Sequence, residues 1–173
     1  MNKLTLIALA IGFIFTAYTS DDTNQTVVPR GDYENGLIIS NEGNFGQGNA
    51  SVSYVSNDLS TVENEIFNNV NNELLGDTAQ SITFLGNLAY IVVNASQKIE
   101  VVDRYTFQSV ATIGTGLVNP RYMAIVNGLG YATDWGDDST DTDDVLAVVD
   151  LNTNTIIRTI ALGEGPEQVI ASG

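Results

Sequence analysis

Short runs of apolar and β-branched residues, separated by turn-forming pairs, recur along the chain from about residue 36 onward. The runs Ile82–Leu85, Ala89–Val93 and Ile99–Val102 have the length and composition of β-strands. Gly-Asn at residues 86–87 and Asn-Gly at residues 127–128 are typical of tight hairpin turns. The pattern therefore predicts an all-β protein built from short antiparallel strands.

One stretch is the best candidate for a helix. Elsewhere between residues 36 and 173, no segment keeps a helical period of apolar positions with capping residues at its ends. Val62–Leu75 comes closest, but several asparagines interrupt it, and asparagine is a poor helix former. We interpret this stretch as a strand followed by a loop.

The strand pattern is repeated. Three segments align with one another and start 47 residues apart, at Ser51–Thr61, Lys98–Gln108 and Val145–Thr155. A second set of positions, at residues 79, 120 and 166, repeats with intervals of 41 and 46 residues. Four short strands in a unit of roughly 40–50 residues is typical of a β-propeller blade, whereas a β-sandwich shows no period of this length.

The repeat predicts a fold class and an extent. We expect a partial β-propeller of about three four-stranded antiparallel blades over residues 36–173. Gly173 falls within a unit, so we expect the chain to be the N-terminal part of a larger propeller. Repeat units bury their faces mainly against neighbours, so such a piece by itself is expected to expose an apolar edge and to associate.

The repeats resemble those of YVTN-type β-propellers. The resemblance rests on Gly163–Ala171, Gly130–Asp134 and Val145–Ile156, which match a Gly-x-x-Pro start, a Tyr-Val-Thr-Asn-like strand and a Val-x-Val-Ile-Asp-like strand. Asn41–Ser51 is similar to the first blade of exported propeller lipoproteins. The resemblance implies a propeller fold and little about function, because propellers host many activities.

The first 20 residues are typical of an export signal. Lys3 precedes the apolar run Leu4–Phe15, which is too short to span a membrane, and small or polar residues follow. We therefore predict a signal peptide over residues 1–20 and a linker over residues 21–35, in a protein exported to the cell envelope, either the periplasm or the outer-membrane surface.

This signal also resembles that of bacterial surface lipoproteins. Tyr18 stands where that family has its lipidated cysteine, so lipid cannot attach there. The mature protein is then either released by cleavage or tethered by an uncleaved signal. Contact with a membrane is expected only through this N-terminal anchor.

Composition excludes several functions. The chain has no cysteine and no histidine, which excludes disulfides, a Ser-His-Asp triad, histidine-ligated metal centres and haem with a histidine ligand. Six basic against 21 acidic residues give a net charge of −15, so nucleic acid is not an expected partner.

The long Asn-, Gly- and Asp-rich loops are expected to gather on one face, because successive loops of a meandering blade alternate between its two ends. Function on rigid scaffolds concentrates in such loops. Phe45 and Trp135 are the candidate aromatic anchors for a sugar or another flat ligand. The candidate ligand-binding residues are Phe45, Trp135, Asn41, Glu42, Asn94 and Arg121.

Each candidate has a structural alternative that the sequence leaves open. Trp135 would equally fill the apolar gap between two blades. The polar candidates would equally bond to the backbone of their own turns.

The acidic loop offers candidate metal ligands. Asp137, Asp141 and Asp143 alternate along the chain in a way that suits Ca²⁺, which prefers carboxylate oxygens. Thr142 stands where an EF-hand loop needs glycine, so the loop is not an EF-hand. The alternative is a solvated acidic loop, and we expect no other cofactor.

These observations favour a binding or scaffold module at the cell envelope over an enzyme. The expected partner is a small molecule, a glycan or an envelope protein. The alternative is a propeller hydrolase or lyase, which would have to use carboxylates such as Glu42 or Asp134, alone or with a metal. A purely structural surface-coat role is the third hypothesis.

Overall fold

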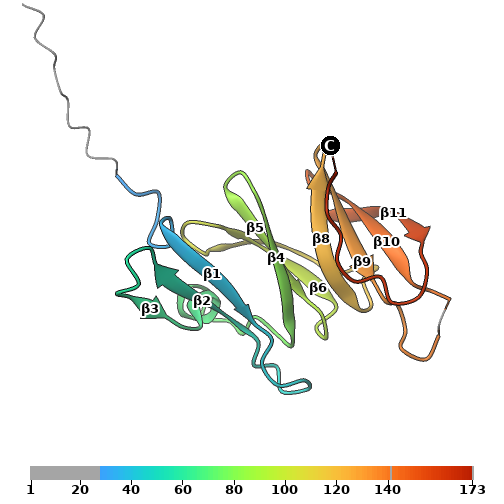
Figure 1. Cartoon of the computed structure of the whole chain (residues 1–173), viewed down its shortest axis with the longest axis horizontal. Helices are drawn as coiled ribbons and strands as arrows, with labels where there is room; N and C mark the ends of the chain where they lie inside the picture. Colours follow the sequence, from blue (N-terminus) through green and yellow to red (C-terminus); the bar gives the residue numbers. More distant parts are fainter. Residues whose placement is uncertain (1–27, 141, 173) are drawn as a thin grey trace, which may run out of the picture.

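Three antiparallel sheets stand side by side in the computed structural model, which describes residues 28–140 and 142–172 (Figure 1). The first sheet has three strands: β1 (Gly36–Asn41), β2 (Ser51–Ser56) and β3 (Val62–Glu63). The second has four: β4 (Ala79–Leu85), β5 (Leu88–Val93), β6 (Lys98–Asp103) and β7 (Ser109–Ile113). The third has four: β8 (Pro120–Val126), β9 (Leu129–Asp134), β10 (Val145–Asp150) and β11 (Thr155–Ala161).

Each sheet is a simple meander in which every strand pairs with its neighbours in the chain. This arrangement confirms the all-β prediction and the short antiparallel strands. The predicted signal peptide over residues 1–20 lies outside the described residues.

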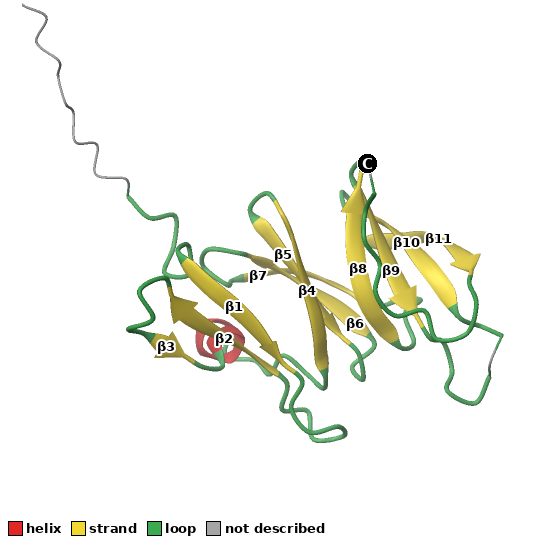
Figure 2. Cartoon of the chain, viewed as in Figure 1, coloured by secondary structure: helices red, strands yellow, loops and turns green. Residues whose placement is uncertain are grey.

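The interpretation of residues 62–75 as strand and loop was wrong in part, because α1 (Ile66–Asn71) is a short helix (Figure 2). Ile66 and Phe67 are buried in the core, and this burial outweighs the weak helix propensity of the asparagines. Asn71 Nδ2 donates to the carbonyl oxygens of Phe67 and Phe107, so one of these asparagines ties the helix to the second sheet. Within the described residues, no helix is long and apolar enough to cross a membrane.

The core is divided into two layers by the second sheet. Along β5, the side chains of Ala89, Ile91 and Val93 pack in the layer toward the first sheet, whereas Tyr90 and Val92 pack in the layer toward the third. This explains why the strand is apolar throughout instead of alternating, since both of its faces are buried.

An aspartate at the end of the third strand of each complete sheet accounts for part of the repeat. Asp103 Oδ1 accepts hydrogen bonds from the backbone N–H groups of Tyr105 and Thr106, both at 2.9 Å. Asp150 Oδ1 accepts one from the backbone N–H of Asn152 at 2.9 Å. Burial opposes ionisation of Asp103, but these hydrogen bonds hold its pKa below the usual value. The aspartates therefore fix the turn into the last strand.

The end of the predicted linker packs on this core. Tyr33 is buried, its ring meets those of Tyr54 and Phe107 edge to face, and its hydroxyl donates to Glu63 Oε1 at 3.0 Å. Residues just before β1 therefore tie the first sheet to the second.

Candidate functional site

A hollow of about 310 Å³ lies where the loops after β1, β5 and β9 meet the first residues of β4 and β8. Five of the predicted ligand-binding residues line it. These are Glu42, Phe45, Asn94, Arg121 and Trp135.

The sixth predicted residue, Asn41, is not in the lining. It ends β1, and its Nδ2 donates to the hydroxyls of Ser51 at 3.2 Å and Ser53 at 2.8 Å. Asn41 therefore bonds to side-chain hydroxyls and not to the backbone of its turn, and its amide bridges β1 and β2.

The repeat explains why residues far apart in the chain meet here. Glu42, Asn94 and Trp135 each follow directly the last residue of a strand, β1, β5 or β9. The three strands hold the corresponding place in their sheets, next to the strand that ends in Ser56, Asp103 or Asp150. Equivalent loop positions of adjacent sheets therefore line one hollow.

The sequence prediction missed Thr78, Gln80 and Asn119 in the lining. Thr78 and Asn119 precede the equivalent strands β4 and β8, and Gln80 is the counterpart of Arg121 in the same two strands. The 41-residue interval between these strands was the signal that would have found them.

Trp135 is held in place from two sides. Its Nε1–H donates to the carbonyl oxygen of Pro166 at 2.9 Å, and the guanidinium carbon of Arg121 lies 4.0 Å from its ring centroid. Arg121 in turn forms a bidentate pair with Glu167, with both N···O distances at 3.0 Å. The half-buried indole is thus a fixed wall of the hollow.

Phe45 differs from Trp135 because the described residues leave most of its side chain uncovered. Its side chain is 81 % exposed and lies in the glycine-rich loop between β1 and β2. Covering an exposed phenyl ring with a ligand removes apolar surface from water, which favours binding.

Asn94 is the counterpart of Trp135 one unit earlier in the chain and lies at the boundary between the second and third sheets. It is buried, and its Nδ2 donates to the carbonyl oxygen of Pro120 at 3.0 Å and to Asn119 Oδ1. Pro120 and Pro166 are the repeat counterparts that the sequence alignment identified. A side-chain N–H bonded to the carbonyl of a proline therefore joins the second sheet to the third, and the third sheet to the segment that follows β11.

The hollow carries negative charge. Glu42 and Asp138 contribute carboxylates, and the charge of Arg121 is already paired with Glu167. A neutral or cationic ligand suits this balance better than an anion.

Asp134, one of the two carboxylates named as examples for the enzyme alternative, is 1 % exposed. Its oxygens accept backbone N–H groups from Val118, Asn119 and Gly136, at 2.9, 2.7 and 2.9 Å. Its carboxylate organises the loop around Trp135.

The acidic loop after Trp135 is ordered by hydrogen bonds between its own residues. Asp137 Oδ1 accepts from the backbone N–H and the hydroxyl of Ser139, which hold the pKa of Asp137 below its usual value. Asp143 Oδ2 accepts from the backbone N–H of Asp137 at 2.9 Å. Gly136 has φ +63, and a Cβ there would lie 2.5 Å from the Asp143 carboxyl carbon, so the loop needs glycine.

Of the predicted calcium ligands, Asp137 and Asp143 belong to this loop, and Asp141 lies outside the described residues. The part of the chain that the structure describes contains no group of three or more acidic residues placed to hold a metal ion. The calcium site stays a prediction.

Comparison with protein families gives one match. The model of a domain of unknown function, DUF5074, matches residues 35–170. The chain belongs to the DUF5074 family. This assignment does not show the YVTN-type resemblance inferred from the repeats. Among curated proteins, no sequence matches this DUF5074 chain.

Solved structures show what the DUF5074 fold is similar to. One similar chain is from "Kuenenia stuttgartiensis Hydrazine Synthase", with a TM-score of 0.58 and 16 % sequence identity. The alignment covers 75 % of the DUF5074 chain and 35 % of the other, so the chain spans about a third of the protein it matches. At this identity the likeness concerns the fold alone.

Proposed function

We propose that the chain is part of an exported β-propeller of the YVTN type, located at the cell envelope, that binds a small polar ligand on its loop face. The three sheets are successive blades, with β4 and β8 as the strands nearest the propeller axis. The meander order of the strands, the contact between β4 and β8, and the fold similarity support this arrangement.

The observation that carries the proposal is the hollow itself. It combines the uncovered ring of Phe45 and the fixed indole of Trp135 with amides, a hydroxyl and two carboxylates. Aromatic faces beside hydrogen-bonding groups suit a sugar, whose ring has an apolar face and a hydroxyl edge. The hollow, with a volume of about 310 Å³, is large enough for a sugar.

A glycan is therefore our first choice among the small molecules, glycans and partner proteins that the sequence suggested. The test is binding of the labelled full chain to an array of neutral, amino and acidic oligosaccharides. We expect capture by neutral or amino glycans and weaker capture by acidic ones, because the hollow is negatively charged.

Phe45→Ala should weaken this capture by about fivefold to thirtyfold, which corresponds to the loss of one aromatic contact. Phe45 is exposed, so the substitution should leave folding unchanged. The matched control is Leu59→Ala, which removes a 69 % exposed apolar side chain elsewhere on the surface. Equal losses in the two variants, a preference for acidic glycans, or capture of none of the array would contradict the proposal.

A further inference from the structure

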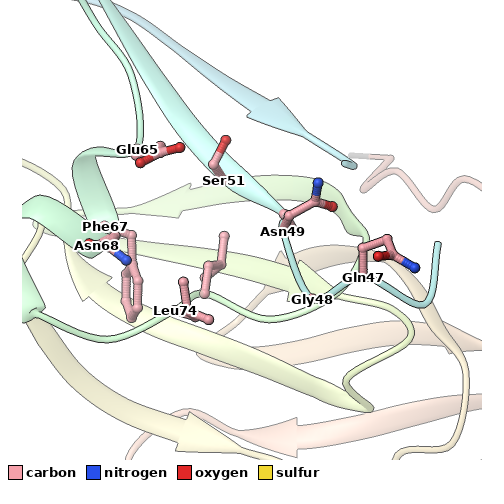
Figure 3. Close-up of a pocket in the computed structure, with 10 residues that line it drawn as sticks. Gln47, Gly48, Asn49, Ser51, Glu65, Phe67, Asn68 and Leu74 are labelled. Carbon is pink, nitrogen blue, oxygen red and sulfur yellow. The ribbon is translucent and has the colours of Figure 1, made fainter. Parts of the chain in front are cut away.

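A second pocket, of about 190 Å³, lies between the start of β2, the helix α1 and the residues that follow the helix (Figure 3). Phe67, Leu75 and Ala50 form its buried apolar part, and Leu74 is 70 % exposed at its side. An engineered apolar cavity of about 150 Å³ is large enough to bind benzene. The pocket therefore has room for a compact organic group.

The charge beside this pocket is negative. Figure 3 shows Glu65 and Ser51 on one side, with Phe67, Asn68 and Leu74 across from them. Among the described residues, Glu65 is the single charged residue in the lining, which contains no Lys or Arg.

The Glu65 carboxylate forms neither a helix cap nor an ion pair with the described residues. It immediately precedes α1 but does not cap the helix, and it takes part in none of the ion pairs among the described residues. Its backbone is held in the left-handed region, with φ 58. An exposed, unpaired carboxylate beside an apolar pocket is complementary to an ammonium group on an apolar body.

The geometry points to a second binding site here, for a small primary amine with a branched aliphatic or aromatic body. The body occupies the space between Phe67, Leu74 and Leu75, and the ammonium group donates to Glu65. This site is separate from the hollow around Trp135, since the two linings share no residue. It does not depend on the proposed glycan function.

The experiment compares three probes with one carbon skeleton: 3-methylbutylamine, 3-methylbutanol and 3-methylbutanoate. Binding to the full chain is followed by ligand-observed NMR titration. We expect the amine to bind with a Kd of about 1–10 mM, the alcohol about threefold to tenfold more weakly, and the carboxylate more weakly still.

Two variants separate the charge from the cavity. Glu65→Gln should make the amine bind no better than the alcohol, whereas Glu73→Gln, the same change at an exposed residue outside the lining, should keep the preference. Asn68→Phe should block all binding by filling the pocket from the helix. Circular dichroism checks that each variant is folded.

Equal binding of the three probes, an amine preference that survives Glu65→Gln, or binding that survives Asn68→Phe would overturn the inference. Absence of amine binding at about 20 mM to the folded wild-type chain would overturn it as well.

Discussion

At the scale of single residues, the two aromatic anchors have different tasks. Trp135 is fixed by Pro166 and Arg121, while Phe45 is free in solvent. The rigid indole supplies shape to the hollow without an entropic cost on binding, and the phenyl ring supplies uncovered apolar surface. Glu167 contributes to the rigidity of Trp135, because it orients Arg121 over the indole.

Glu167→Gln should loosen the wall of the hollow. The neutral amide pairs less strongly with Arg121, so the guanidinium leaves the indole part of the time. Trp135 is the one tryptophan of the chain, so its fluorescence reports this site directly. We expect a red-shifted emission and stronger acrylamide quenching, with a stability loss of about 0.5–1 kcal/mol because the pair is partly exposed.

The control for this substitution is Glu164→Gln, an equal charge change in the same segment at a residue that does not contact Arg121. An unchanged spectrum in the Glu167 variant would mean that Trp135 is held by Pro166 alone.

At the scale of elements, equivalent side chains tie the second sheet to the third and the third sheet to the segment after β11. Asn94 bonds to Pro120 and Trp135 bonds to Pro166, each from the loop after the second strand of a unit. Hydroxyls add to the boundary between the second and third sheets, where Ser81 and Thr83 of β4 donate to backbone carbonyls of β8. The inner strands are therefore connected by hydrogen bonds from side chains to backbone as well as by apolar packing.

Asn94→Ala should weaken the boundary between the second and third sheets. It leaves the Pro120 carbonyl without its donor and removes a buried amide, a change worth about 1–2 kcal/mol. Urea unfolding measures this loss. Asn87→Ala is the control, because this exposed side chain forms no hydrogen bond within the described residues, and a similar loss in both variants would show that the latch is not what stabilises the boundary.

At the scale of the whole molecule, apolar side chains remain exposed on both outer sheets. Leu37 and Ile39 on β1 are 57 % and 38 % exposed, and Ile157 and Ile160 on β11 are 56 % and 37 % exposed. Both sheets thus present apolar side chains that pack against no other sheet of the described chain.

We expect the isolated chain to associate at micromolar concentration despite its net charge of −15, because apolar strand faces pair readily. Leu37→Lys with Ile39→Lys should reduce this association in sedimentation velocity. The same charge change at Leu59 and Val110, which are exposed elsewhere, should reduce it less. A wild-type chain that stays monomeric at all concentrations would contradict the expectation.

The repeat in the sequence was enough to predict the strands and their order. A period of 47 residues reports local chemistry, namely the apolar run of a strand and the aspartate that turns the chain after it, and both act over a few residues. The 41-residue interval between β4 and β8 also contained the lining residues Thr78 and Gln80, which were not among the predicted ligand-binding residues.

The helix α1 and the sorting of the polar candidates depended on the tertiary structure. Ile66 and Phe67 become helical because a core formed by two sheets buries them. Helix propensity is a local property and does not include that core. Asn41 and Asn94 have the same side chain, but the first bridges two strands and the second latches two sheets beside the hollow. Which partner an amide finds is set by residues distant in the chain, so the sequence determined the units of this protein, and only their packing determined what each polar group does.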